Sequence, residues 1–310
     1  MHYIKDMADG HRIHDVYYCK TKISTETKTG KPYDSLVLQD KTGTLDTKVW
    51  DPNSPGIGEY EAGDFIEVTG DVITFNNALQ AKLTRIRRCN EGEYDLDEYM
   101  PCSKKNIDEM FISLLKLIDT VEDEYLNKML HSFFDDKDFC DKFRNASAAK
   151  TVHHGFIGGL LEHSLSVAET CDFMSKKYPI LKRDLLVTAA MLHDIGKIRE
   201  LSAFPVNDYT DEGQLLGHIV MGSQMVAEKA SVIGGFPQVL LAELQHCIIA
   251  HHGEFEFGSP KKPAIVEAMA LNLADNMDAK METFTEILEA NDREGWIGFN
   301  KFLDSNIRKT

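Results

Sequence analysis

The chain has 310 residues, of which 43% are hydrophobic and 27% are charged. This length suits two domains of about 100–200 residues each, and the composition excludes fibrous, mucin-like and wholly disordered proteins. No apolar run reaches the roughly 18 residues of a membrane span, and the start, MHYIKDMADGHR, lacks the apolar stretch of a secretory signal. The six cysteines are at least 13 residues apart, which excludes CxxC zinc motifs and predicts a protein of the reducing cytoplasm.

The net charge of −16 is unevenly distributed along the chain. Residues 1–90 contain 12 basic and 13 acidic residues, whereas residues 91–310 contain 22 and 37. An acidic surface repels the phosphates of a nucleic acid, so the nearly neutral first part is the one expected to attract such a ligand. The acidic segment EGEYDLDEYMP between the two parts is typical of a solvated linker. We therefore predict a domain at 1–90, a linker at 91–103, and a second domain at 104–310 with its core at about 150–290.

Residues 1–90 have the pattern of a small all-β domain. Runs rich in Ile, Val, Thr and Tyr are separated by turn clusters such as DKTG at 40–43, and four or five short strands fit into this length. The turn-rich, nearly neutral segment resembles an oligonucleotide-binding (OB) fold. The open face of such a barrel stacks bases on aromatic side chains and contacts phosphates through Lys and Arg.

Candidate nucleic-acid contacts follow from strand alternation. In the run 45–50, Lys48 and Trp50 fall on the face opposite Leu45 and Val49. The segment 65–88 ends in a basic cluster. Each aromatic residue could instead be packing, and the basic cluster could simply be solvated. The residues expected to contact nucleic acid are Lys48, Trp50, Phe75, Arg85 and Arg87.

After the linker the hydrophobic periodicity becomes helical. The first helix is expected to have Ser103 as its N-cap, because apolar residues recur at helical spacing from Ile107 to Ile118. The second domain is therefore expected to be all-α. Further helices are predicted over 122–134, 159–177, 183–193, 215–231, 237–251 and 263–289.

Histidines concentrate in this helical domain, where eight of the twelve lie between positions 153 and 252. A single histidine on a helix is more often structural than metal-binding. A set of imidazoles and carboxylates on successive helices is harder to explain in that way, because facing helices of a bundle are where such side chains build metal sites. The candidates lie in LLEH, ending at His163, in MLHDIGK (191–197), in LLGH, ending at His218, in AHHG (250–253) and in LADNMD (273–278).

An isolated His, a His-Asp pair at a helix end and a distal Asp resemble the HD superfamily of metal-dependent phosphohydrolases. The matching residues are His163, His193, Asp194 and Asp275. The segment HDIGK, with AAML before it and AHHGE further along, makes this a specific combination.

The additional His218 and the pair His251-His252 resemble the binuclear branch of that superfamily. Within it, an OB-like domain followed by an HD domain resembles the YhaM-type 3′→5′ exoribonucleases. This resemblance extends over nearly the whole chain and includes the segments HHGF (153–156), LLGHI (215–219) and HHGEFEFGSPKKP (251–263).

The resemblance implies two divalent metal ions, with Mn²⁺ first, although a mixed imidazole and carboxylate set also accepts Fe, Co, Ni or Zn. It favours a catalytic Lys197 that holds a phosphate oxygen, whereas spacing alone equally fits a cation at the end of a helix. His153 and His154 are expected to touch substrate or orient ligands. For His154 and His252, direct metal binding and a supporting contact to a ligand are both left open. The implied ligands are His163, His193, Asp194 and Asp275 for one ion, and Asp194, His218, His251 and His252 for the other.

The predicted function is removal of 5′-mononucleotides from the 3′ end of single-stranded RNA, with single-stranded DNA and assembly into a homo-oligomer left open. Two metal ions would supply the nucleophile and the positive charge that hydrolysis of an anionic phosphodiester needs. One alternative is a phosphohydrolase for a small nucleotide or cyclic dinucleotide, which the absence of a GYP motif after His251-His252 disfavours. The other is a nucleic-acid-binding protein with a non-catalytic HD domain, which the complete ligand set disfavours.

Overall fold

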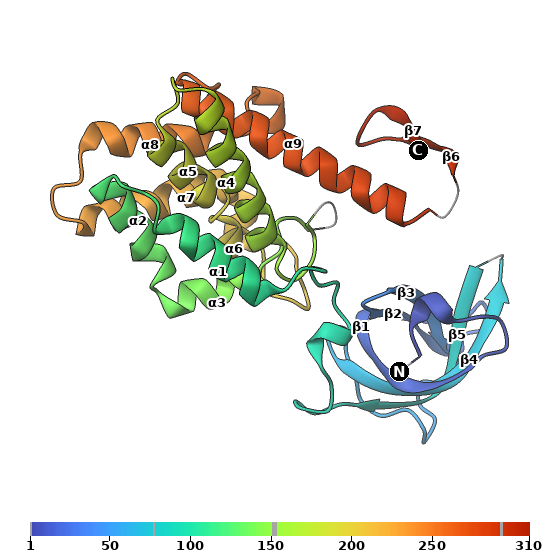
Figure 1. The fold of residues 1–310 in the computed structure, drawn as a ribbon. Helices are drawn as coiled ribbons and strands as arrows, with labels where there is room; N and C mark the ends of the chain where they lie inside the picture. The colour runs from blue at the N-terminus through green and yellow to red at the C-terminus, as the bar shows by residue number, and fades with distance from the viewer. Residues whose placement is uncertain (1, 77, 151–153, 292–293) are drawn as a thin grey trace. The chain divides into compact units, whose positions relative to one another are not determined.

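The computed structural model describes residues 2–76, 78–150, 154–291 and 294–310. The chain forms two compact units, one of Met1–Cys102 with Phe204–Val206 and one of Ser103–Ala203 with Asn207–Thr310. The predicted fold class, a small β barrel followed by a helical domain, is confirmed (Figure 1). Within the described ranges, no helix combines the length and the apolar character that crossing a bilayer requires.

The first unit contains a closed five-stranded barrel with the strand order β1-β2-β3-β5-β4. β1 pairs with both β2 and β4, and a register shift between Cys19 and Thr21 lets one long strand serve both neighbours. The parallel pairing of β3 with β5 closes the sheet, as in an OB-like barrel. The strands are β1 (Arg12–Glu26), β2 (Pro32–Asp40), β3 (Gly43–Val49), β4 (Phe65–Phe75) and β5 (Ala78–Arg88).

The alternation predicted for β3 is present. Leu45, Thr47 and Val49 are buried, whereas Asp46 faces solvent and Trp50, just after the strand, is 47% exposed. The inward residues join an aliphatic core from all five strands. Strand alternation therefore decides which side chains the barrel offers to a ligand.

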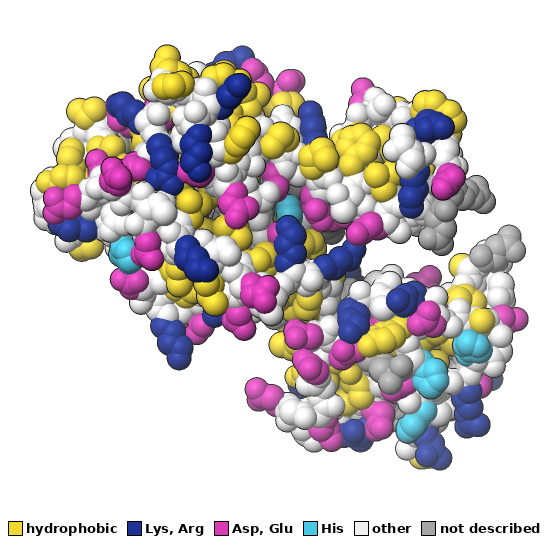
Figure 2. Space-filling view, viewed as in Figure 1, with side chains coloured by type: hydrophobic (Ala, Val, Ile, Leu, Met, Phe, Trp, Pro, Cys, Tyr) yellow, Lys and Arg dark blue, Asp and Glu magenta, His cyan; other side chains and the backbone are white. Residues whose placement is uncertain are grey.

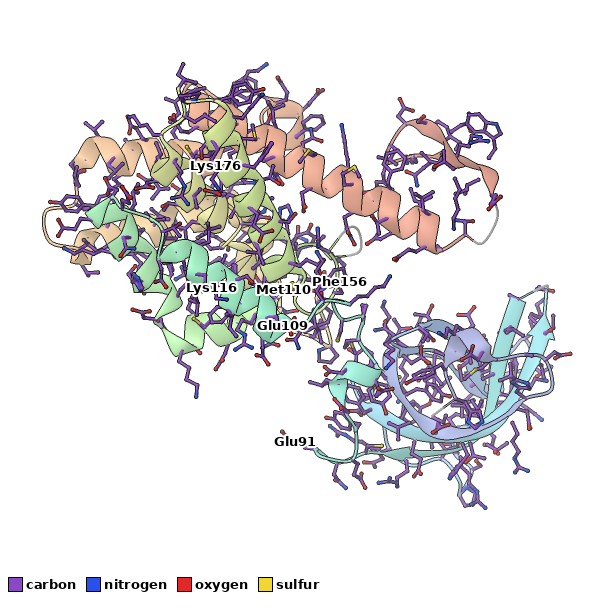
Figure 3. All side chains as sticks on the ribbon, viewed as in Figure 1. Glu91, Glu109, Met110, Lys116, Phe156 and Lys176 are labelled. Carbon is purple, nitrogen blue, oxygen red and sulfur yellow. The ribbon has the colours of Figure 1, made fainter. Side chains whose placement is uncertain are left out.

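The segment predicted as a solvated linker packs on the barrel instead. Tyr94 stacks on Phe65 with ring centroids 3.8 Å apart, and Tyr99 and Met100 are 5% and 0% exposed. The acidic side chains between these residues stay at the surface, and Glu91 points into solvent (Figure 3). The boundary between the units lies after Cys102 rather than at residue 90, because three apolar or aromatic side chains outweigh the polar composition of the segment.

All seven predicted helices are present in the second unit, which also contains the short helices α3 and α6. A further short 3₁₀ turn, η3 (Phe255–Phe257), precedes α9. The helices are α1 (Ile107–Ile118), α2 (Glu124–Phe134), α3 (Lys137–Asn145), α4 (Gly159–Lys177), α5 (Arg183–Leu192), α6 (Lys197–Glu200), α7 (Asp211–Val232), α8 (Gln238–Ala250) and α9 (Val266–Glu289).

The N-cap predicted at Ser103 is wrong. The N-cap of α1 is Asn106, whose side chain accepts hydrogen bonds from the first-turn amides of Asp108 and Glu109. The Ser103 hydroxyl instead donates to Glu162 of α4 at 2.6 Å. The helix that follows is amphipathic, with Met110 buried and Glu109 and Lys116 on its outer face (Figure 3).

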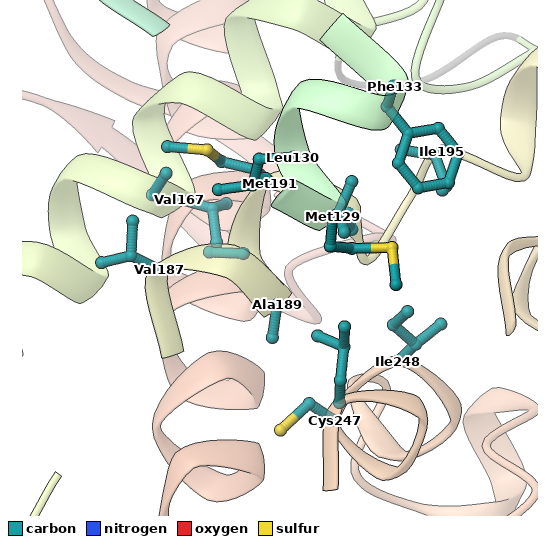
Figure 4. Packing of buried hydrophobic residues seen from close by; sticks show 14 of the residues in the cluster. Met129, Leu130, Phe133, Val167, Val187, Ala189, Met191, Ile195, Cys247 and Ile248 are labelled. Carbon is teal, nitrogen blue, oxygen red and sulfur yellow. The ribbon is translucent and has the colours of Figure 1, made fainter. Parts of the chain in front are cut away.

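Helix α5 is the centre of the helical unit. Every residue from Leu185 to Leu192 is buried, and a helix that is hydrophobic on all sides belongs in the interior. Its end therefore delivers His193 and Asp194 into the core rather than to the surface. Side chains of α2, α4, α5 and α8 meet here, as Figure 4 shows for Met129, Leu130, Phe133, Val167, Val187, Ala189, Met191, Cys247 and Ile248.

The all-α expectation for the second domain needs one correction. The chain ends in a β hairpin of β6 (Gly295–Asn300) and β7 (Ser305–Lys309). Ile307 is 2% exposed, and the Lys309 ammonium donates to the carbonyls of Leu288 and Asn291 at the end of α9. The alternation in GWIGFN and SNIRK was the available signal for these strands.

Candidate metal centre

The predicted ligands converge on one point inside the helical unit. Five helices contribute, because each ligand lies on a helix or directly after one. Groups of three ligand atoms within 4.8 Å of one another are formed by His163, His193 and Asp275, by His193, Asp194 and His251, and by His218, His251 and His252.

Asp194 lies between two sets of imidazoles. Its Oδ2 atom is 3.6 Å from His163 Nε2 and 3.4 Å from His193 Nε2. Its Oδ1 atom is 3.4 Å from His218 Nε2 and 3.7 Å from His251 Nε2. One carboxylate therefore serves two half-sites. The first half-site is His163, His193, Asp194 and Asp275, and the second half-site is Asp194, His218, His251 and His252.

In every predicted ligand histidine, the Nδ1 atom lies next to a hydrogen-bond acceptor. The Nδ1 atoms of His193, His251 and His252 lie 2.7, 2.6 and 2.8 Å from the carbonyl oxygens of Ala190, Ile248 and Phe257. His163 Nδ1 lies 2.7 Å from Asp278, and His218 Nδ1 lies 3.0 Å from Glu200. A proton on Nδ1 leaves the Nε2 lone pair directed at the centre, which is the arrangement of metal-binding histidines.

Three buried polar atoms at the centre have no hydrogen-bond partner among the described residues. They are Asp194 Oδ1, His218 Nε2 and His251 Nε2. Buried polar atoms are almost always partnered, so an unpartnered group of acceptors needs an explanation. A divalent cation would supply the missing partner for all three atoms, and the donor set fits such an ion.

Two glycines bring α7 against the turn that follows α5. A Cβ atom on Gly196 would lie 2.0 Å from the carbonyl oxygen of His218, so no larger residue fits there. Gly217 has a φ of 74°, which interrupts α7 one residue before the ligand. The His218 amide consequently donates to the Glu200 carboxylate at 2.9 Å. This backbone break orients the second half-site.

The two half-sites differ in charge. Burial opposes ionisation of Asp194, but Lys197, 2.6 Å away, and the surrounding imidazoles outweigh it and hold the pKa of Asp194 well below its usual range. Burial likewise opposes protonation of His163, but hydrogen bonds to Asp275 and Asp278 raise its pKa to about 10. Burial and the neighbouring His252 and His193 lower the pKa of His251. The first half-site thus combines carboxylates with an imidazole whose proton a metal must displace, whereas His251 in the second half-site favours its neutral form.

The remaining predicted residues take different positions. Lys197 forms an ion pair with Asp194 and also lines the pocket beside the centre. His154 Nε2 lies 3.0 Å from Asp278, which also holds His163, so His154 contacts the partner of a ligand. His153 lies outside the described residues.

The sequence analysis gave no role to two carboxylates that contact the predicted ligands. Asp278 accepts hydrogen bonds from Ser166 as well as from His154 and His163. Burial opposes ionisation of Asp278, but the two histidines outweigh this effect and lower its pKa. Glu200 holds both the amide and the ring of His218. Asp278 lies one helical turn after Asp275, which was a usable signal. No spacing rule pointed to Glu200, because it reaches His218 only through the fold.

The centre opens into a pocket of about 620 Å³. Its inner wall includes His163, Asp194 and Asp275, and its outer wall includes residues 302–304 from the turn of the C-terminal hairpin. A pocket of about 300–1,000 Å³ holds a molecule of drug size, which is the size class of one nucleotide.

On the barrel, Lys48 and Trp50 form part of an exposed surface. Trp50 stacks on Tyr33 with ring centroids 5.0 Å apart, and Lys48 hydrogen-bonds Ser35. Lys82 on β5 is the register partner of Lys48; Lys82 is exposed, whereas Lys48 is half-buried. The structure therefore adds Tyr33 and Lys82 to the predicted residues, and we call Tyr33, Lys48, Trp50 and Lys82 the barrel platform.

The other predicted barrel residues are less uniform. Phe75 is 56% exposed at the end of β4, and Arg85 is exposed on β5. Arg87 is held by two carboxylates, Glu67 at 2.8 Å and Glu93 at 2.9 Å. Arg87 is exposed and its charge is paired with these two carboxylates, so its contact with a phosphate stays a prediction.

Comparison with known proteins decides the family. The HD domain family matches residues 160–280, a range that contains all seven predicted metal ligands. The curated 3′-5′ exoribonuclease YhaM of Bacillus subtilis (strain 168) is 34% identical over 292 residues, which cover 91% of this chain and 92% of that protein. This chain belongs to the YhaM 3′-5′ exoribonuclease family.

Other YhaM proteins give the same result. YhaM of Bacillus velezensis is 34% identical over 91% of this chain and 92% of its own length, and YhaM of Geobacillus sp. (strain WCH70) is 33% identical over 89% and 85%. The match to YhaM thus includes both the barrel and the HD domain. Among solved structures, the second OB-fold domain of replication protein A from Methanococcus maripaludis is 22% identical and covers 30% of this chain and 98% of that chain, with a TM-score of 0.22.

Proposed function

We propose that this chain is a metal-dependent 3′-5′ exoribonuclease that releases 5′-mononucleotides from the 3′ end of single-stranded RNA. The observation that carries the proposal is Asp194, whose two oxygens face two sets of imidazoles inside a chain of the YhaM family. A carboxylate shared in this way suits a binuclear phosphodiesterase centre.

Two divalent ions, with Mn²⁺ proposed as the physiological one, would be held by the two half-sites. When bound, the ions supply an activated water and the positive charge that stabilises the phosphate during displacement. The bond between phosphorus and the 3′ oxygen of the penultimate nucleotide breaks, the water oxygen joins the phosphorus, and the leaving 3′ oxygen takes up a proton. The product is a 5′-mononucleotide and a strand shortened by one residue.

The residues of the chain orient and hold the reacting groups. Glu200 and Asp278 fix the rings of His218 and His163, which keeps the two half-sites at a constant separation. Lys197, on the wall of the pocket, is the proposed contact of a non-bridging phosphate oxygen. To make that contact, the Lys197 ammonium must move away from Asp194, because it lies 2.6 Å from Asp194 Oδ2.

The barrel platform is the proposed grip on the strand. The exposed Trp50 ring stacks on the half-buried Tyr33 ring, and Lys48 and Lys82 lie on adjacent strands. Aromatic stacking with nearby cations is how OB folds hold single strands without reading sequence. RNA is the proposed ligand, and single-stranded DNA is the comparison in every assay.

A reducing cytoplasm is the proposed compartment. All six cysteines are free, and five of them are buried. Buried thiols with no disulfide partner are typical of proteins in reducing surroundings.

The test is incubation of the purified chain and Mn²⁺ with single-stranded RNA labelled at its 5′ end. We expect a ladder that shortens from the 3′ end, release of 5′-mononucleotides, and no products after chelation. Intact RNA together with hydrolysis of a free nucleotide or a cyclic dinucleotide would instead identify a small-molecule phosphohydrolase. RNA that is bound but never cut would identify a nucleic-acid-binding protein.

A further inference from the structure

The turn of the C-terminal hairpin forms one wall of the pocket at the metal centre. Phe302, Leu303 and Asp304 line this pocket together with Lys197 and Asp275. The Asn300 side chain accepts hydrogen bonds from the amides of Phe302 and Leu303 at 2.9 and 3.1 Å, which fixes the backbone of the turn. This wall comes from a different part of the chain than the metal ligands.

Two aromatic rings stand at the rim of the same pocket. Phe302 is 71% exposed and Phe257 is 62% exposed, and both line the pocket. The Phe257 backbone is tied to the centre, because its carbonyl lies 2.8 Å from His252 Nδ1. Hydrophobic side chains gather over α9 and the hairpin (Figure 2), and rings kept this accessible beside a polar site offer flat faces for stacking.

An exonuclease that removes every nucleotide must hold each of the four bases. Hydrogen-bond readout would discriminate among bases, whereas stacking does not, because every base has a π face. The pocket volume of about 620 Å³ suits a terminal nucleotide in contact with both the acidic centre and the aromatic rim.

We propose that Phe302, presented by the β6–β7 turn, and Phe257 stack on the bases at the 3′ end of the strand and thereby position the terminal phosphodiester at the metal centre. This inference rests on the proposed exonuclease function. It assigns to the hairpin a direct role in substrate binding that is separate from the grip of the barrel platform.

The decisive variant is Phe302→Ala, with Phe299→Ala as its matched control. Phe299 lies on the same hairpin and is 63% exposed, but it lines a different cavity with Ile287 and Ile307. We expect Phe302→Ala to raise KM for single-stranded RNA about 5- to 150-fold, the range for loss of a stacked base. We expect kcat to change much less, Phe299→Ala to behave like the unmodified protein, and Phe302→Trp to retain its affinity.

A substrate change separates stacking from a structural effect. RNA with an abasic 3′-terminal residue lacks the base but keeps the phosphodiester. We expect the unmodified protein to bind abasic RNA more weakly than normal RNA, by the same factor by which Phe302→Ala weakens binding of normal RNA. Phe302→Ala itself should bind abasic and normal RNA almost equally well. If Phe302→Ala weakened binding of normal RNA and of abasic RNA by the same factor relative to the unmodified protein, the proposal would be overturned. The turn would then act through the fold of the pocket.

A binding measurement without catalysis keeps this test independent of the nuclease activity. RNA carrying 2-aminopurine at its 3′ end is added to protein whose metal ions have been removed with a chelator. The fluorescence of the 2-aminopurine is then followed. Stacking on Phe302 should quench the fluorescence in the unmodified protein and in Phe299→Ala, and less in Phe302→Ala. Equal quenching in all three proteins contradicts the proposal even if RNA is degraded, whereas quenching without degradation supports it and contradicts the proposed nuclease function.

Discussion

The barrel platform and the metal centre hold their side chains in different ways. On the barrel, Trp50 is 47% exposed and packs on one neighbouring ring. At the metal centre, His193, Asp194 and His251 are 0, 2 and 1% exposed, and each imidazole is fixed by an acceptor on its Nδ1. Buried side chains that orient one another act as a unit, so replacing one affects the others. Exposed side chains make small contributions to binding that are independent of one another. Replacements in the two regions should therefore differ in size and in what they affect.

The largest expected effect is that of Asp194→Asn. The neutral amide removes the charge that both half-sites share, so metal content should fall in both and kcat should drop roughly 10³-fold or more, since the ions provide several kcal/mol of stabilisation. Metal analysis and the RNA ladder measure the two outcomes. His218→Ala is the comparison, and it should lose metal from the second half-site only. Near-normal turnover of Asp194→Asn would refute the shared carboxylate.

Glu200→Gln should have the next largest effect. Glutamine fills the same space but holds the His218 ring less firmly, and loss of such a partner typically costs about 10–100-fold in metal affinity or activity. Metal titration by calorimetry checks this change. Glu212→Gln, on the exposed first turn of α7, is the matched control and should be silent. If both variants bind metal equally well, Glu200 does not orient the second half-site.

Trp50→Ala tests the exposed region. It should weaken binding of long single-stranded RNA by about 1–3 kcal/mol, the contribution of one stacked base, and leave cleavage of a dinucleotide almost unchanged. Trp296→Ala, the other tryptophan and 69% exposed, is the control. An equal loss on long and short substrates would mean that Trp50 supports the fold instead of the strand.

The smallest effect concerns stability and its dependence on pH. Asp172 accepts hydrogen bonds from Lys176 and Arg183, and these cations outweigh burial and lower its pKa. Asp172→Asn should reduce the free energy of unfolding at pH 7 by about 1 kcal/mol.

The sign of the pH dependence follows from the lowered pKa of Asp172. The stabilisation is complete above the unfolded-state pKa of about 3.9 and is lost as the pH falls through the lower folded-state pKa. Chemical denaturation at several pH values should show the two proteins converging in acid. Asp138→Asn, in an exposed pair with Lys142, is the control with a smaller effect. A difference that grows in acid would contradict this account.

The sequence allowed good prediction of residues whose role follows from local pattern. Strand alternation placed Trp50 outward, and the resemblance to the HD superfamily selected seven side chains that lie close together in the structure. Residues whose role depends on distant partners were missed. Glu200 meets His218 only because α7 breaks, and Arg87 forms an ion pair with Glu67 because strand register places the two residues opposite each other.

Composition gave a wrong prediction for a polar segment in which a few apolar residues determine the packing. The segment 91–101 contains five acids, yet Tyr94, Tyr99 and Met100 attach it to the barrel. The C-terminal hairpin was overlooked because its strands are short and follow a long helix. No periodicity rule signals that its turn returns to the pocket beside the predicted metal ligands.

The break in α7 at Gly217 makes one amide a reporter of the metal centre. In an unbroken helix the His218 N–H would be bonded to a backbone carbonyl and would exchange with solvent as the helix opens. Here it donates to the Glu200 side chain, so its exchange depends on whether the His218 ring and Glu200 are held in place. Ordering of the second half-site can thus be followed by hydrogen exchange at a single position, while the neighbouring amides of α7 report the global stability of the helical unit.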